Sequence, residues 1–190
     1  MMRVATLILC MLVIASVSLA EKAPFEYPNN APLTTERQGG DTVDTATVID
    51  VLPFGATGTT IGFTDDYDAI CPYTGSTSPD VVYSLVACAD GFLDITLCIE
   101  PTDYDTKLYV FDANMNEIAC EDDACSIPVS YVSELTTALG TAVPVVMGEL
   151  YYIIVDGYGG GSGNYGIAIT GLDCGTAADV SSFSIVKSLY

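Results

Sequence analysis

Short runs of β-branched and aromatic residues, separated by Gly, Pro, Asn and Asp, dominate residues 41–172 of this chain. In residues 92–99, Leu and Ile alternate with polar residues, and this period of two is typical of a half-buried β-strand. Residues 153–155 are apolar in succession, which indicates a central strand covered on both faces. The repeated short runs restrict the chain to folds built from strands.

The spacing of these runs predicts an all-β fold, an antiparallel β-sandwich that is jelly-roll-like, with about eight to nine strands. No window of eleven or more residues shows a helical stripe with caps. No internal repeat of propeller or solenoid length is present. The predicted strands are 46–51, 59–63, 81–87, 92–99, 107–111, 130–135, 143–147, 151–155 and 165–170.

The N-terminus has the features of a signal peptide. Arg3 is followed by an apolar stretch, and small residues precede a cleavage point after Ala20. We therefore expect residues 1–20 to be removed and the protein to be secreted, extracellular or at the cell surface, with an uncleaved N-terminal anchor as the alternative. Residues 21–39 are polar, contain Pro and Asn, and are expected to form a leader or linker.

Six cysteines follow the predicted signal peptide, and export to an oxidising compartment favours disulfides between them. Proximity suggests one pair, Cys120 with Cys125, because four residues between them can form a tight loop. The sequence does not choose among the other pairings. A thiolate metal site is the competing interpretation, but the chain has no C-x-x-C pair.

The charge balance excludes several classes of function. The chain has 25 Asp and Glu against 5 Lys and Arg, a formal net charge of −20 and no His. So few basic residues cannot cover a phosphate backbone or an anionic membrane surface, so neither is an expected partner. Without His, catalytic Ser-His-Asp and Cys-His groups and imidazole-based zinc sites are excluded.

The acidic residues gather in the middle of the chain, where fourteen lie between Asp65 and Asp123 against the single base Lys107. Carboxylates clustered in loops repel one another, and a hard divalent cation that takes oxygen ligands relieves this repulsion. Calcium is the expected cofactor because it accepts irregular shells of loop oxygens. Solvated acidic loops that keep the protein soluble are the alternative. The candidate metal ligands are Asp65, Asp66, Asp68, Asp105, Asp122 and Asp123.

Tyrosine is the main aromatic residue, with twelve copies, and several crowd residues 151–170 around a glycine-rich stretch. The glycines predict a turn with positive φ joining two strands as a hairpin. A phosphate cradle is the rival interpretation, but it lacks the following helix and Lys. Exposed Tyr suits recognition of sugars or extended peptides, whereas cross-strand packing is the ordinary use. The candidate ligand-binding residues are Tyr151, Tyr152, Tyr158 and Tyr165.

Four motifs in order resemble the bacterial pre-peptidase C-terminal domain family, which is related to collagen-binding modules of collagenases. They are the D-x-V-Y strand start in 79–84, the Y-D-T-x-L-x-V strand in 104–110, the D-D loop in 119–125, and the Y-x-I-x-V-D-G-Y segment in 151–159 with G-x-Y in 163–165. The resemblance covers residues 40–172. It implies a compact, non-catalytic β-sandwich found in secreted proteins and often attached to peptidases.

The related collagen-binding modules bind calcium and hold substrate with surface aromatics, but the leader that supplies their calcium ligands has no match in residues 21–40. The family is usually attached to a peptidase domain, and residues 1–39 do not contain one, so we expect a weak link to proteolysis. Residues 173–190 are expected to form a linker or the start of a truncated further domain, with a last edge strand at 183–186 as the alternative.

The function predicted from these observations is that of a non-catalytic module for substrate or surface binding or for stabilisation of an extracellular protein, with calcium as a possible stabiliser. Its expected partner is an extracellular polymer, protein or glycan, or a neighbouring surface protein. Two alternatives stay open. One is an enzyme that uses a carboxylate pair, as in glycoside hydrolysis, and the other is a structural subunit of a cell-surface assembly.

Overall fold

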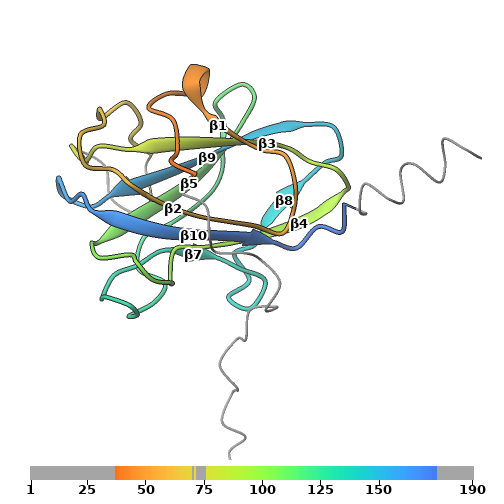
Figure 1. Ribbon diagram of the computed structural model, residues 1–190. Coiled ribbons are helices and arrows are strands. Elements are labelled where there is room, and N and C mark those ends of the chain that lie inside the picture. The colour runs from red at the N-terminus through yellow and green to blue at the C-terminus, as the bar shows by residue number, and fades with distance from the viewer. Residues whose placement is uncertain (1–36, 70, 72–75, 175–190) are drawn as a thin grey trace, which may run out of the picture. The chain divides into compact units, whose positions relative to one another are not determined.

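The computed structural model describes residues 37–69, 71 and 76–174, and these form two β-sheets packed face to face (Figure 1). The first sheet has the order β1-β3-β9-β5-β6, formed by Thr47–Ile49, Val81–Val86, Leu150–Gly157, Thr106–Asp112 and Glu117–Glu121. The second has the order β2-β10-β4-β7, formed by Phe54–Thr59, Asn164–Thr170, Gly91–Thr96 and Glu134–Leu135. β8 (Val143–Val145) pairs with β4, and a single 3-10 turn, η1, spans Val43–Thr45.

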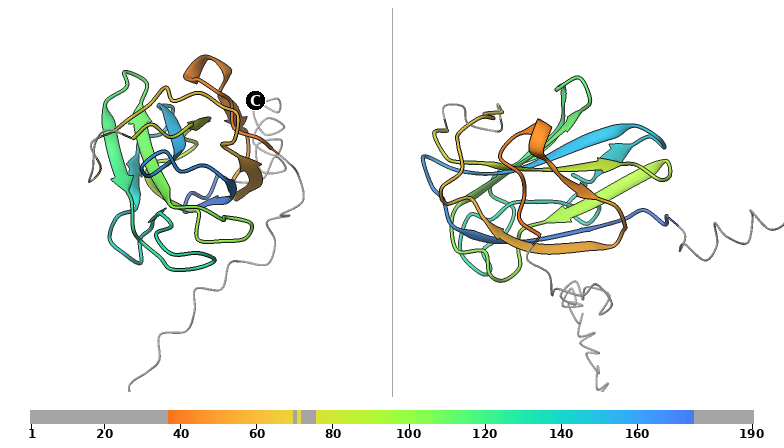
Figure 2. Two further views of the ribbon diagram at one scale, coloured as in Figure 1. Left: turned by 90° about the vertical axis from the view of Figure 1, so that its left-hand side faces the viewer. Right: turned by 45° about the horizontal axis from the view of Figure 1, so that its top comes forward.

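The predicted all-β sandwich is confirmed, with ten strands in the described residues where eight to nine were expected. Every strand pair is antiparallel except β1 with β3. The end-on view in Figure 2 shows the strands of the two sheets enclosing a common interior. The additional strand, β6, was missed because its residues are half-buried or exposed and carry no apolar alternation.

The main core lies between the sheets, and the central strand β9 shows how the sequence builds it. Ile153 and Val155 point into this core, whereas Ile154 points to the opposite face of the first sheet, and all three are fully buried. The prediction of a strand covered on both faces is therefore confirmed. In β4, Leu93 and Ile95 are fully buried in the main core, as the period of two predicts.

A second, smaller apolar cluster covers the outer face of the first sheet. It contains Ala69, Cys71, Val82, Tyr109 and Ile154 as its buried members. Residues from η1 and from the segment between β2 and β3 pack over it, and the N–H of Val43 donates to the hydroxyl of Tyr67 at 2.9 Å. The central strands of the first sheet are thus covered on both faces.

Two local predictions were wrong because strand pairing depends on residues distant in the sequence. The strand predicted at 59–63 lies at Phe54–Thr59, and residues after Thr60 form a turn. The predicted hairpin between 151–155 and 165–170 does not form, because β9 pairs with β3 and β5 while β10 pairs with β2 and β4. The glycine-rich stretch does adopt positive φ, at Gly159 (61°) and Gly160 (87°), but it carries the chain from one sheet to the other.

The six described cysteines form three disulfides, as export predicted, but the suggested pair Cys120–Cys125 is wrong. Cys120 packs against the outer cluster, whereas Cys125 packs against the main core. The two side chains therefore lie on opposite faces of the first sheet, which prevents them from meeting. The observed bonds are Cys71–Cys120, Cys88–Cys174 and Cys98–Cys125.

The sandwich extends slightly beyond residues 40–172 at both ends. The hydroxyl of Tyr83 donates to the carbonyl of Arg37 at 2.7 Å, and Cys174 bonds to Cys88. The predicted signal peptide, most of the predicted leader and the segment 175–190 lie outside the described residues. Within the described ranges, no helix has the length and apolar character needed to cross a membrane.

Candidate functional site

Three carboxylates meet at one end of the first sheet and form what we call the acidic trio, Asp105, Asp122 and Asp123. Asp105 immediately precedes β5, and the two other residues immediately follow β6. Because β5 and β6 are antiparallel, with Leu108 opposite Glu121, the start of one strand lies beside the end of the other. One carboxylate oxygen from each residue lies within 4.8 Å of the other two.

The acidic trio contains buried oxygens that lack hydrogen-bond partners. Asp122 is 2% exposed, and the Oδ1 atoms of Asp122 and Asp105 are both buried without a partner. Burial, followed by the charges of Asp123 and Asp105, raises the pKa of Asp122 to about 6. Burial and the charge of Asp123 also raise the pKa of Asp105. Native proteins rarely leave such oxygens unsatisfied, so the arrangement suits an oxygen-seeking cation.

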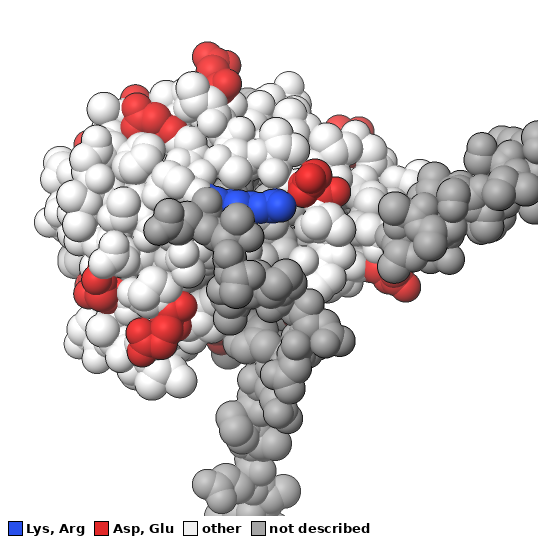
Figure 3. Space-filling view, in the orientation of Figure 1, with Lys and Arg blue, Asp and Glu red and all other residues white. Residues whose placement is uncertain are grey.

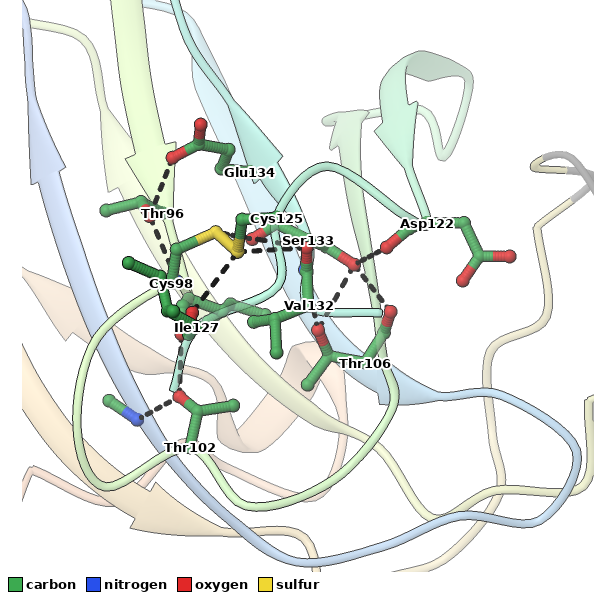
Figure 4. The surroundings of a disulfide bond; sticks show 12 residues. Thr96, Cys98, Thr102, Thr106, Asp122, Cys125, Ile127, Val132, Ser133 and Glu134 are labelled. Atoms are coloured by element: carbon green, nitrogen blue, oxygen red, sulfur yellow. Dashed lines mark hydrogen bonds between the residues drawn. A yellow bond between two sulfur atoms is a disulfide. The ribbon is translucent and has the colours of Figure 1, made fainter. Parts of the chain in front are cut away.

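Hydrogen bonds fix the backbone that carries the acidic trio. The hydroxyl of Ser133 donates to the carbonyl of Asp122 at 2.6 Å, and the hydroxyl of Thr106 contacts that of Ser133 at 3.1 Å. The adjacent Val132 exchanges backbone hydrogen bonds with Cys125, which the disulfide ties to Cys98. Figure 4 shows the carbonyl of Asp122 turned toward Ser133 and its carboxylate directed away from the disulfide. The carboxylate is therefore presented from a rigid segment.

Two tyrosines flank the acidic trio. Together with Asp105, Asp122 and Asp123, Tyr131 and Tyr158 line a hollow of about 270 Å³, which we call the tyrosine-flanked hollow. Tyr131 is 58% exposed and Tyr158 is 47% exposed. The carbonyl of Tyr131 accepts the N–H of Thr106, and the N–H of Tyr158 donates to the carbonyl of Asp105, each at 3.1 Å. The backbone of each tyrosine is thus tied to the start of β5 or to Asp105 just before it.

The backbone of Tyr131 is strained, with φ of 66°. This left-handed region is uncommon for residues other than Gly, Asn and Asp. Strained backbone persists only where the surrounding structure holds it in place, and it is frequent at functional sites. Tyr131 was not predicted as a site residue, because it lies outside both the four motifs and the tyrosine-rich segment 151–170.

The predicted tyrosine site is dispersed by the fold. Tyr165 is fully buried, with its hydroxyl 2.8 Å from that of Tyr83, and Tyr151 is 6% exposed and belongs to the main core. These two predictions were wrong because the residues face the opposite sheet. Tyr152 packs on the outer cluster, on the face of the first sheet opposite to Tyr151. Of the four, Tyr158 alone lines the tyrosine-flanked hollow.

The first predicted group of metal ligands, Asp65, Asp66 and Asp68, does not converge. The hydroxyl of Thr64 donates to the carboxylate of Asp66, and an oxygen of Asp68 lies 3.9 Å from Nζ of Lys107. Asp65 is exposed. Among the described residues, the acidic trio is the group whose side chains come close enough to share a metal ion.

A buried set of charges that the sequence did not predict crosses the outer face of the first sheet. Val81 pairs with Val155, and Lys107 pairs with Asp156, so Asp80, which immediately precedes β3, lies in line with Asp156 on β9 and Lys107 on β5. We call these three residues the charge row. Each is at most 1% exposed. The hydroxyl of Tyr109 donates to Asp156 at 2.7 Å, and one oxygen of Asp80 accepts two backbone N–H groups at 2.9 Å.

The charge row makes stability depend on pH. Burial raises the pKa of both Asp80 and Asp156 to about 7, and the charges of Asp66 and Asp65 add to the shift at Asp80. Lys107 opposes the shift at Asp156. Ordinary carboxyl pKa values near 4 apply to the unfolded chain, so the folded chain binds more protons between about pH 4 and pH 7. The contribution of these two carboxyls to stability is therefore fully present below about pH 4 and is lost as the pH rises through about 7.

Urea unfolding is expected to show lower stability at pH 8 than at pH 5, by an amount on the order of a few kcal/mol. The double variant D80N/D156N should weaken this dependence, whereas the exposed control D44N should retain it. The measurement is made in EDTA, so that no cation contributes. Stability that increases from pH 5 to pH 8 in the wild-type chain would contradict the raised pKa values.

The surface of the sandwich offers little positive charge. Figure 3 shows one face on which acidic side chains are scattered and basic surface is scarce. The described ion pairs involve Arg37 with Asp50 and the buried Lys107 with Asp68. The described residues therefore present little positive charge to a phosphate group.

Comparisons with known proteins give a structural similarity. No family model matches the chain, and no curated protein matches it. Among solved structures, it is similar to the pre-peptidase C-terminal domain of collagenase from Bacillus anthracis. The two chains are 15% identical, the match covers 72% of this chain and 97% of that chain, and the TM-score is 0.41. The family named there is the one that the four sequence motifs resemble.

Proposed function

We propose that this chain is a secreted, non-catalytic β-sandwich module that binds an extracellular polymer at the tyrosine-flanked hollow and is stabilised by calcium. The observation that carries the proposal is the acidic trio, in which the Oδ1 atoms of Asp105 and Asp122 are buried without partners beside two exposed tyrosines. Calcium fits because it accepts carboxylates from loops in irregular geometry, whereas magnesium demands a near-ideal octahedron. The signal-like N-terminus and three disulfides support export.

The chemistry of the hollow favours binding over catalysis. Its lining residues are carboxylates and phenols, and the chain contains no His to move a proton near neutrality. The carboxylate oxygens of the acidic trio converge within 4.8 Å of one another. In glycoside hydrolysis, by contrast, two carboxylates flank a bond from opposite sides of the sugar. Convergence suits a cation held between three acids.

Calcium is expected to raise the melting temperature of the purified chain, and EDTA to reverse the effect. A ligand that binds only the folded state adds about 2.7 kcal/mol at a hundredfold excess over its dissociation constant. The variant D122N keeps the size of the side chain and removes the charge of the most buried ligand, so its melting temperature should not respond to calcium. Differential scanning calorimetry measures both.

The matched control is D65N, which changes an exposed acid of the other predicted metal loop. It should respond to calcium as the wild-type chain does. A melting temperature insensitive to calcium and EDTA in the wild-type chain rules out the calcium proposal. A response that D65N abolishes and D122N retains would place the ion in the other loop.

A further inference from the structure

The tyrosine-flanked hollow is larger than a bound ion requires. Its volume of about 270 Å³ is several times the roughly 30 Å³ that one water molecule occupies, and it approaches the lower end of small-molecule sites, about 300 Å³. Calcium takes six to eight oxygen ligands. Three carboxylates binding through one oxygen each leave several positions to be filled from the hollow.

The negative charge of the hollow favours a neutral ligand over an anionic one. Three carboxylates around a divalent cation leave a net negative charge, and the lining residues include no Lys or Arg. Lys107, which lies beside Asp156 on the sheet, is 1% exposed and does not reach the surface. An anionic group would therefore meet unfavourable charge without a basic partner, whereas neutral hydroxyl oxygens can bind the cation without that cost.

The two tyrosines add flat, amphipathic contact area. Tyr131 and Tyr158 are about half-exposed and line the hollow together with the acidic trio, and a backbone hydrogen bond ties each residue to Thr106 or to Asp105. The backbone of Tyr131 is held in its strained conformation because the neighbouring Val132 exchanges two backbone hydrogen bonds with Cys125. Aromatic rings at such positions give apolar contact with one face while the hydroxyl stays wet.

We infer that the hollow binds a neutral saccharide in a calcium-dependent manner, with adjacent sugar hydroxyls completing the ion's coordination and the sugar ring packed on Tyr131 and Tyr158. This inference rests on the proposed calcium site. It names neutral glycan as the extracellular polymer, and it assigns to Tyr131 a role in binding rather than in stability.

The test is isothermal titration of the full purified chain with soluble mannan, dextran and galactan in calcium and in EDTA. At least one neutral polymer should bind in calcium and lose binding in EDTA. Y131G should weaken binding by about fivefold or more while its melting temperature changes by less than ~4 °C, because Gly adopts positive φ without strain. Y158A should weaken binding similarly, and both variants should keep the calcium-induced rise in melting temperature.

The matched control is F92A, which removes an aromatic side chain that is 58% exposed on β4 and does not line the hollow. Binding unaffected by Y131G and Y158A would overturn the inference. So would preferential binding of polygalacturonate as an anionic polymer, or binding of gelatin with none of the neutral polymers. If calcium still raises the melting temperature in these cases, the proposed metal site is retained and only the saccharide inference is overturned. Release of reducing ends from a bound polymer would instead establish hydrolysis and overturn both proposals.

Discussion

Replacing Lys107 by Met is expected to lower the free energy of unfolding by about 3–5 kcal/mol at pH 8. Lys107 is 1% exposed, and its Nζ lies 3.9 Å from Asp68 and 5.2 Å from the centre of the Tyr109 ring. It also lowers the pKa of Asp156 and Asp122, against the effect of their burial. Met matches the length of the Lys stem, so the loss comes from carboxylates left without their compensating charge rather than from a cavity.

Measurements at two pH values separate the loss of charge compensation from the loss of packing. At pH 5, Asp80 and Asp156, whose pKa values are about 7, are protonated and no longer need the lysine. The destabilisation by K107M should therefore be smaller at pH 5 than at pH 8 in guanidinium unfolding. R37M is the control, because Arg37 forms an exposed ion pair with Asp50 and its loss should cost about 1 kcal/mol or less. An equal loss by K107M at both pH values would show that packing, not charge, is responsible.

The charge row also illustrates what the sequence could not predict. Lys107 stands out in the sequence as the single base among fourteen acids, but its acidic neighbours on the sheet belong to strands about 27 and 49 residues away. Only the register of β3, β9 and β5 brings them together. Local periodicity predicts that a residue lies on a given face, and it carries no information on which strand lies beside it.

The same reason explains which predictions of the sandwich succeeded. The alternation in β4 and the apolar run in β9 depend on burial of each strand by itself, and both were confirmed. The predicted hairpin after β9 depended on pairing with β10, which the completed first sheet prevents because β3 and β5 already occupy both edges of β9. The predicted disulfide Cys120–Cys125 was wrong for a similar reason, since closeness in sequence does not place two side chains on one face.

The candidate site was predicted in part. Carboxylates in loops are recognisable from the sequence, and the chain brings Asp105 together with Asp122 and Asp123 because β5 and β6 are neighbours. The flanking tyrosines were not predictable from residue type. Tyr165 and Tyr131 are the same amino acid, yet Tyr165 is fully buried between the sheets, whereas Tyr131 is 58% exposed and has a left-handed backbone conformation.

Removing the Cys98–Cys125 disulfide with the double variant C98A/C125A is expected to lower both stability and calcium affinity. The bond closes a sequence separation of 27 residues, which the chain-entropy relation converts to about 3.5 kcal/mol. Cys125 also holds Val132, whose neighbours Tyr131 and Ser133 position the hollow and the carbonyl of Asp122. Loss of the bond frees this segment, so calcium must order it again on binding. Urea unfolding in EDTA and calcium titration measure the two effects separately.

The double variant C88A/C174A distinguishes local positioning from general destabilisation. That bond spans 86 residues, so the same relation gives a larger loss of about 4.5 kcal/mol. Cys88 follows the end of β3, and the antiparallel pairing of β3 with β9 puts that end opposite the one where β9 meets Thr106 and the acidic trio. Calcium affinity should therefore fall in C98A/C125A, the less destabilised variant, and stay unchanged in C88A/C174A. Affinity that instead follows stability across the two variants would mean that the disulfide acts on the whole fold and not on the site.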